Sequence, residues 1–194
     1  AFLEPYKKGM ELAIDEINAA GGVNGRKLEL ITRDDNANPG DAVRVAEELV
    51  TRERVDVLTG TFLSNIGLAV ADFAKQKKVF FLAGEPLTDK LTWQGGNEYT
   101  FRLRPGTYMQ AAMLVPEAAK LKKKRWAVVY PNYEYGQSAT AAFKALSSAI
   151  WLFVSPAAIN FKTSVSRSVS SVNNGCSSPF SPRNSSIAMK PSDL

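Results

Sequence analysis

Ser64 is the side chain whose type and position best suit chemistry in this sequence. It stands between an apolar, strand-like run at residues 55–59 and a helix-like stretch at residues 64–76. We expect the Ser64 hydroxyl to cap that helix. The unpaired N–H groups and the positive dipole end of a helix N-terminus also suit a carboxylate. Two interpretations remain open: Ser64 is only a cap, or it also binds the carboxylate of a small ligand.

Two other polar turns follow predicted strands in the same way, at residues 84–88 and 132–136. In an open parallel sheet, ligands bind beyond the carboxyl ends of the strands. We therefore predict that these turns and residues 61–65 surround one cleft. Glu85, in the first turn, could hold a ligand ammonium group or make a salt bridge at the rim, and both alternatives stay open.

Other kinds of active site are disfavoured. The sequence contains no histidine, which excludes a Ser-His-Asp triad, a Cys-His pair and an imidazole metal site. Residues 21–25 follow a predicted helix rather than a strand, so they do not form a dinucleotide loop. Asp34, Asp35 and Asp41 lack further spaced oxygen ligands, and a strand end and a helix cap explain them better than a cation site does. We predict no catalytic residue, no cofactor, no metal and no enzyme activity.

The elements that position these residues alternate between helix and strand. Met10, Ala13, Ile14 and Ile17 have the spacing of one apolar helix face that packs on a sheet. Such alternation with short connections predicts an α/β fold with a doubly wound parallel sheet. Strands are expected at residues 27–35, 55–59, 79–83, 99–103 and 125–130, helices at residues 9–20, 64–76, 108–121 and 135–148 and from Pro39 after a cap at Asn38, and irregular structure at residues 1–8.

The C-terminal part differs in composition. Residues 1–150 carry 20 basic and 18 acidic side chains, so the net charge of +5 does not indicate a nucleic-acid partner. Residues 151–194 contain 12 serines and one acidic residue, Asp193, without a helical or strand period. We predict that the tail, residues 150–194, is largely disordered.

The run GMELAIDEINAAGGVNGRKLELITRDDNANPGDAV resembles the opening of the periplasmic solute-binding proteins of the leucine/isoleucine/valine type. These proteins are the ligand-capturing subunits of ABC importers. The resemblance covers residues 1–148 and implies a type I periplasmic-binding fold, with a first lobe at residues 1–106 and the start of a second lobe at residues 107–149. The initial central strand of that family is missing here, which leaves the strands near Leu30 and Val57 without a partner between them.

The resemblance also implies a binding site. It predicts that Ser64 grips a ligand carboxylate and that Tyr135 closes over the ligand, although Tyr135 could equally pack beneath its own loop. Glu85 and Leu87 depart from the small and hydroxyl residues usual in amino-acid binders. The full set of implied ligand-binding residues is Ser64, Leu63, Glu85, Leu87, Tyr135 and Phe2.

The implied function is capture of an amino acid or related small carboxylate between two lobes, for delivery to the membrane permease of an ABC transporter. The resemblance implies a periplasmic monomer, although no signal peptide is visible in this chain. Because only one strand and one helix of the second lobe match, we expect weak or no binding. Two alternatives are the effector-sensing domain of a transcription regulator with the same fold, and an α/β enzyme such as a hydrolase or dehydrogenase.

Overall fold

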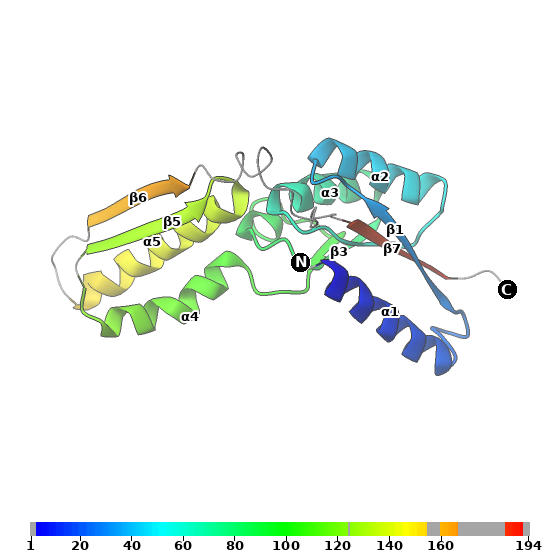
Figure 1. The fold of residues 1–194 in the computed structure, drawn as a ribbon, viewed down its shortest axis with the longest axis horizontal. Helices are drawn as coiled ribbons and strands as arrows, with labels where there is room; N and C mark the ends of the chain where they lie inside the picture. Colours follow the sequence, from blue (N-terminus) through cyan, green and yellow to red (C-terminus); the bar gives the residue numbers. More distant parts are fainter. Residues whose placement is uncertain (1–2, 124, 155–159, 167–184, 192–194) are drawn as a thin grey trace, which may run out of the picture. The chain divides into compact units, whose positions relative to one another are not determined.

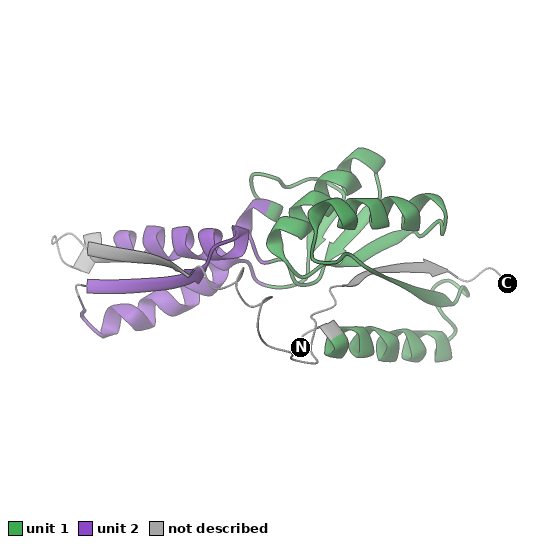
Figure 2. Cartoon of the chain, turned by 45° about the horizontal axis from the view of Figure 1, so that its top comes forward, with its two compact units in different colours: residues 1–86, 91–104, 178–194 green, residues 87–90, 105–177 purple. Residues whose placement is uncertain are grey.

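The computed structural model describes residues 3–123, 125–154, 160–166 and 185–191. The chain divides into two compact units, which Figure 2 colours separately. Unit 1 comprises residues 1–86, 91–104 and 178–194, and unit 2 comprises residues 87–90 and 105–177.

Unit 1 is a five-stranded sheet covered by helices. The strand order is β1-β7-β2-β3-β4, with parallel pairing between β2 and β3 and between β3 and β4. Helices α2 and α3 lie on one face of this sheet and α1 lies on the other (Figures 1 and 2). This arrangement confirms the predicted α/β class. The elements of unit 1 are α1 (Leu3–Ala19), β1 (Leu28–Asp34), α2 (Pro39–Thr51), β2 (Val57–Gly60), α3 (Ser64–Lys77), β3 (Phe80–Ala83), β4 (Thr100–Arg102) and β7 (Ser185–Pro191). The 3-10 helix η1 (Asp89–Leu91) begins in unit 2 and ends in unit 1.

Strand β7 occupies the position between β1 and β2 that the sequence analysis left without a partner. It pairs antiparallel with both neighbours, and Ala188 lies opposite Ile31 on one side and Leu58 on the other. Residues 185–191 therefore differ from the disordered tail that composition predicted, and so do residues 160–166, which form β6 (Asn160–Ser166). The physical reason is that unpaired backbone groups of β1 and β2 offer a strand hydrogen bonds that do not depend on its side chains.

Helix α2 forms as its sequence predicts. The Asn38 side chain accepts hydrogen bonds from the N–H groups of Gly40 at 2.8 Å and Asp41 at 3.2 Å, which confirms the cap. The inward face of α2 packs into a core shared with α3, β2 and β3. The buried members of this core include Ala42, Val45, Ala46, Leu49, Leu58, Ile66, Val70, Phe73, Ala74 and Phe81.

Helix α1 departs from the prediction at its start and on its apolar face. It begins at Leu3, so the expectation of irregular structure at residues 1–8 is wrong for residues 3–8. Ile14 is buried, whereas Ile17 is 38% exposed. Polar contacts near the end of the helix help to hold it on the sheet, because the Asn18 side chain donates to the Leu28 carbonyl at 2.9 Å and accepts from the Leu28 N–H at 2.7 Å.

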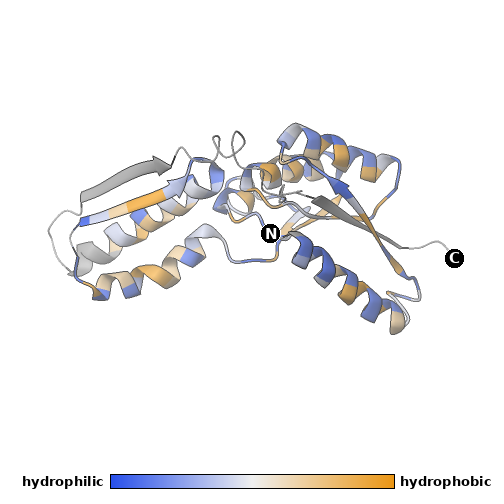
Figure 3. Ribbon diagram, viewed as in Figure 1, coloured by the Kyte–Doolittle hydropathy of each residue, from blue (hydrophilic) through white to orange (hydrophobic). Residues whose placement is uncertain are grey.

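Unit 2 contains a smaller sheet and two long helices: α4 (Thr107–Lys120), β5 (Arg125–Pro131), α5 (Glu134–Val154) and β6. Strands β5 and β6 pair in parallel, α5 packs on β5, and α4 packs on α5. Pro116 lies inside α4 without ending it. The middle of β5 is strongly apolar (Figure 3), and Val129 there is 72% exposed. Within the described residues, no helix combines the length and the apolar character that a membrane span requires.

Candidate functional site

In unit 1, three neighbouring parallel strands end at one edge of the sheet. Their register places Gly60 of β2 opposite Ala83 of β3, and Ala83 opposite Arg102 of β4. The chain leaves this edge through residues 61–63, 84–86 and 103–104. Because the carboxyl ends of parallel strands lie together, these short segments form the candidate site of unit 1.

The Ser64 prediction needs one correction. The N-cap of α3 is Leu63, which has an extended backbone and makes no side-chain cap bond, while Ser64 is the first helical residue. Ser64 is only 2% exposed, so its hydroxyl lies inside the protein rather than on an open edge. The first turn of α3 contains no acidic residue. No acidic side chain of that turn therefore compensates the positive dipole end of α3, and a helix start of this kind favours an anion.

Thr61 is a polar residue of this site that the sequence analysis did not single out. It has a left-handed backbone with φ of 56° and is 2% exposed. Its hydroxyl has no hydrogen-bond partner within the part of the chain that the structure describes. A buried hydroxyl without a partner is unfavourable by about 1–3 kcal/mol. Sequence gives no signal for this state, which depends on tertiary packing.

Glu85 forms an ion pair with Arg104, in which Arg104 Nη1 donates to Glu85 Oε2. The Glu85 side chain is 15% exposed and that of Arg104 is 48% exposed. Of the two alternatives left open for Glu85, the structure contains the salt bridge. Arg104 is a residue of this edge that the sequence did not indicate, because sequence alone does not reveal that the turns after β3 and β4 meet.

Two close contacts bring the surrounding elements to this edge. A Cβ added to Gly67, in the first turn of α3, would lie 2.5 Å from Pro86 Cγ. The hydroxyl of Tyr6 in α1 lies 3.3 Å from Thr59 Oγ1 and also contacts Gly84. The first turn of α3, the turn after β3 and the start of α1 are therefore packed against one another.

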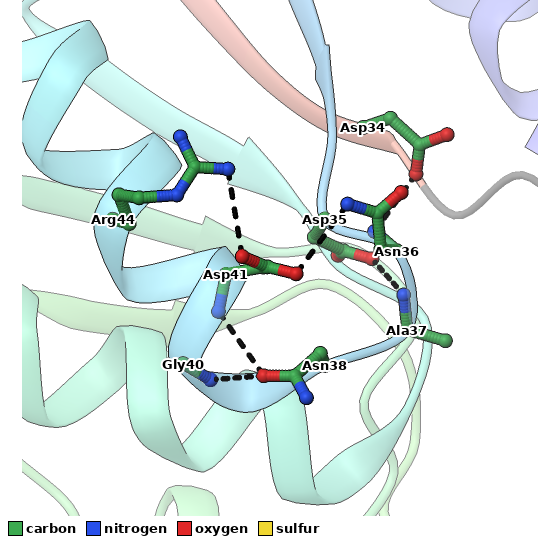
Figure 4. A network of polar contacts seen from close by, with 8 residues as sticks. All are labelled: Asp34, Asp35, Asn36, Ala37, Asn38, Gly40, Asp41 and Arg44. Atoms are coloured by element: carbon green, nitrogen blue, oxygen red, sulfur yellow. Dashed lines mark hydrogen bonds and ion pairs between the residues drawn. The ribbon is translucent and has the colours of Figure 1, made fainter.

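The acidic residues between the end of β1 and the start of α2 have structural partners (Figure 4). Asp34 Oδ1 accepts from the Asn36 N–H at 2.9 Å, and Asp35 Oδ1 accepts from the Ala37 N–H at 3.0 Å. Asp41 Oδ1 lies 3.5 Å from Arg44 Nη2. These contacts agree with a strand end and a helix cap, as the sequence analysis favoured over a cation site.

Leu87 and Tyr135, the other predicted ligand residues, belong to unit 2, and both are half-buried. The Leu87 carbonyl accepts from the Thr107 N–H at 2.9 Å. Glu134, at the start of α5, accepts from the Thr88 hydroxyl at 2.7 Å and from Lys90 Nζ at 2.9 Å. Residues 87–90 are thus bound to α4 and α5. Phe2 lies outside the described residues.

A cavity of about 330 Å³ lies within unit 2 between α4, β5 and α5. Tyr135 lines it together with Phe143 and Thr140, whose buried hydroxyl has no partner among the described residues. Close by, burial raises the pKa of the Tyr133 hydroxyl above its ordinary value, and the charge of neighbouring Tyr135 adds to the rise. Of the predicted ligand residues, the cavity contains only Tyr135.

Comparison with known proteins shows the family. The sequence profile described as "Periplasmic binding protein" matches residues 1–154. The chain therefore belongs to the periplasmic binding protein family. Its fold is the type I periplasmic-binding fold, of which it contains a part, as the sequence resemblance predicted.

Individual relatives agree with this assignment. The chain is 30% identical over 146 residues to Leu/Ile/Val-binding protein homolog 3 of Brucella melitensis, covering 75% of this chain and 39% of that protein. An ABC transporter substrate-binding protein from Desulfitobacterium hafniense, solved in complex with Leu, has a TM-score of 0.70 at 26% identity and covers 81% of this chain and 45% of its own.

A third relative carries a different ligand. The solute-binding protein of an ABC transporter from Rhodopseudomonas palustris BisB5, solved with 3,4-dihydroxybenzoic acid, has a TM-score of 0.62 at 30% identity and covers 69% of this chain and 36% of its own. These relatives are solute-binding proteins rather than enzymes. The present chain spans about two fifths of the curated relatives it matches, at 39% of their length.

Proposed function

We propose that this chain binds an amino acid or a related small carboxylate as part of the substrate-binding component of an ABC importer. In this proposal the ligand carboxylate lies at the carboxyl ends of β2, β3 and β4 in unit 1, against the first turn of α3. No covalent bond is made or broken. The carrier works as a monomer in the periplasm and passes its ligand to a membrane permease.

The buried Thr61 hydroxyl carries the proposal. It adjoins the start of α3 and lacks a partner among the described residues. A carboxylate oxygen would accept its hydrogen bond and remove the penalty of an unpaired buried group. The N–H groups and the positive dipole end at a helix start favour the same negative charge. In this proposal Leu63 and the backbone of Ser64 contact the ligand from this turn, and contacts from Leu87, Tyr135 and Phe2 are predicted as well.

A nuclear magnetic resonance titration of the full chain tests this function. Small carboxylic acids and amino acids at millimolar concentration would be added to ¹⁵N-labelled protein, with the corresponding primary amides as uncharged controls. We expect saturable shifts of the Leu63, Ser64 and Asn65 amide signals with at least one carboxylate and none with its amide. If no member of the panel moves these signals, the proposed function is wrong.

A further inference from the structure

The ion pair between Glu85 and Arg104 bears on which carboxylates this site accepts. Both residues lie at the carboxyl-end edge of unit 1, Glu85 after β3 and Arg104 after β4. Pro86, the neighbour of Glu85, packs against Gly67 in the first turn of α3. The pair therefore adjoins the helix start at which the proposed function places a ligand carboxylate.

We infer that the Glu85–Arg104 pair makes this site selective for carboxylic acids that lack an ammonium group, over zwitterionic amino acids. The inference rests on the proposed function and names the ligand class of the same site. An amino acid needs two complementary charges from the protein: donors for its carboxylate and a carboxylate for its ammonium group. In the proposed site, the first turn of α3 and the Thr61 hydroxyl would serve the carboxylate, whereas the Glu85 carboxylate is already paired with Arg104.

The charge of Glu85 is already compensated. Arg104 donates directly to its carboxylate, and the Glu85 side chain is 15% exposed. An ammonium group that displaced Arg104 would leave the guanidinium without its carboxylate partner. The ammonium group would have to break this hydrogen-bonded ion pair and lose its own hydration to reach Glu85, which is the more shielded partner. A ligand ammonium therefore competes with a cation that the fold holds in place.

The other carboxylates at this edge do not replace Glu85. Strand β1 runs in the same direction as β2, since both are antiparallel to β7, so Asp34, its last residue, and Asp35 also lie at a carboxyl end. Asp34 accepts from the Asn36 N–H, and Asp35, which is fully buried, accepts from the Ala37 N–H (Figure 4). Both carboxylates are thus hydrogen-bonded to the turn before α2.

Arg104 still has donors for an acid. A guanidinium carries five N–H donors, and the contact with Glu85 uses Nη1. The Arg104 side chain is 48% exposed, so its remaining donors are accessible from solvent. A carboxylate without an ammonium group would accept hydrogen bonds from Arg104, from the first turn of α3 and from the Thr61 hydroxyl. It brings no ammonium group that would need a carboxylate of the protein.

The test compares leucine with 4-methylpentanoate, which is leucine without its ammonium group. Dissociation constants at pH 7 would come from amide shifts of the full chain. We expect 4-methylpentanoate to bind at least tenfold more tightly.

Arg104→Gln, which frees Glu85, should lower that ratio of affinities at least fivefold, because it weakens binding of 4-methylpentanoate and strengthens binding of leucine. Glu85→Gln should raise the affinity for the acid. Arg52→Gln removes the same charge from an exposed position at the end of α2 and should leave the ratio unchanged.

The outcomes separate the two proposals. If leucine binds the wild-type chain as tightly as 4-methylpentanoate, the selectivity inference is overturned while the proposed function stands. If neither compound nor any other carboxylate binds, the proposed function itself fails. The wild-type comparison needs no variant. If Arg104→Gln does not fold, Glu85→Gln provides a second test. An unchanged affinity of Glu85→Gln for 4-methylpentanoate would count against the inference.

Discussion

The Thr107 hydroxyl donates a 2.5 Å hydrogen bond to Asp89 Oδ2, and both side chains are buried. The same oxygen accepts a hydrogen bond from the Tyr108 N–H at 2.8 Å. Asp89 therefore satisfies donors in the first turn of α4, although it lies 18 residues before Thr107 in the chain. Both residues belong to unit 2, which shows how residues 87–90 are fixed to it.

Asp89→Ala should lower the free energy of unfolding by about 1–3 kcal/mol, because it leaves buried donors without an acceptor. Urea denaturation followed by circular dichroism measures the change. Asp72→Ala removes an exposed carboxylate from α3 and should change stability by no more than about 0.5 kcal/mol. Equal effects of the two substitutions would show that Asp89 is not a structural anchor.

Gly67→Ala should destabilise unit 1. The new Cβ would lie 2.5 Å from Pro86 Cγ and 2.6 Å from Pro86 Cβ, and a proline ring cannot rotate away. Overpacking of this kind costs about 1–3 kcal/mol. Gly9→Ala is the matched control, because nothing lies within 4 Å of its new Cβ, and it should stabilise α1 by about 0.5–1 kcal/mol. Thermal denaturation of the two variants should therefore shift in opposite directions, and a shared direction would contradict the packing described here.

Ala188→Pro tests the central position of β7. Ala188 has a partner on each side, Ile31 in β1 and Leu58 in β2, so a proline there removes a ladder donor from the middle of the sheet. We expect faster hydrogen exchange at amides of β1 and β2 and a loss of stability of at least about 1 kcal/mol. Ala188→Ser keeps the N–H and should protect these amides as the wild type does. Unchanged exchange in the proline variant would mean that β7 does not hold β1 and β2 together.

Tyr133 should make stability fall at alkaline pH. Its pKa is raised above the ordinary 10.0, mainly by burial. Between pH 10.0 and the raised pKa, Tyr133 has lost its proton in the unfolded chain and has kept it in the folded chain. The free energy of unfolding therefore declines as the pH rises through this window, and the contribution of Tyr133 is fully present below it. Urea denaturation at successive pH values should show a steeper decline for the wild type than for Tyr133→Phe. Parallel curves would contradict the assigned shift.

Local chemistry explains how much of the fold was predictable. The cap at Asn38 and the helix start at Pro39 are signals within one element, and the structure reproduces both of them. The pairing of β7 with β1 joins segments more than 150 residues apart, in a stretch whose serine-rich composition has no strand period. Backbone hydrogen bonds decide that pairing, and composition does not report them.

The candidate site was predictable only as a set of turns. The alternation of strands and helices is visible in the sequence, and it indicated that residues 61–65 and 84–88 each follow a strand of a parallel sheet. The partner of Glu85 was not visible, because it depends on the meeting of the turns after β3 and β4. The burial of Ser64 and of the Thr61 hydroxyl likewise depends on side chains from several elements.

The most direct measurement is a titration of 4-methylpentanoate into the wild-type chain, Thr61→Val and Thr61→Ser. Valine replaces a buried hydroxyl that has no protein partner among the described residues, so the unliganded variant should be as stable as the wild type or more stable by about 1 kcal/mol. If the hydroxyl serves a bound carboxylate, Thr61→Val should bind about tenfold more weakly, whereas Thr61→Ser should bind nearly as the wild type does. Equal affinity of the wild type and Thr61→Val would contradict a carboxylate site at this edge of the sheet.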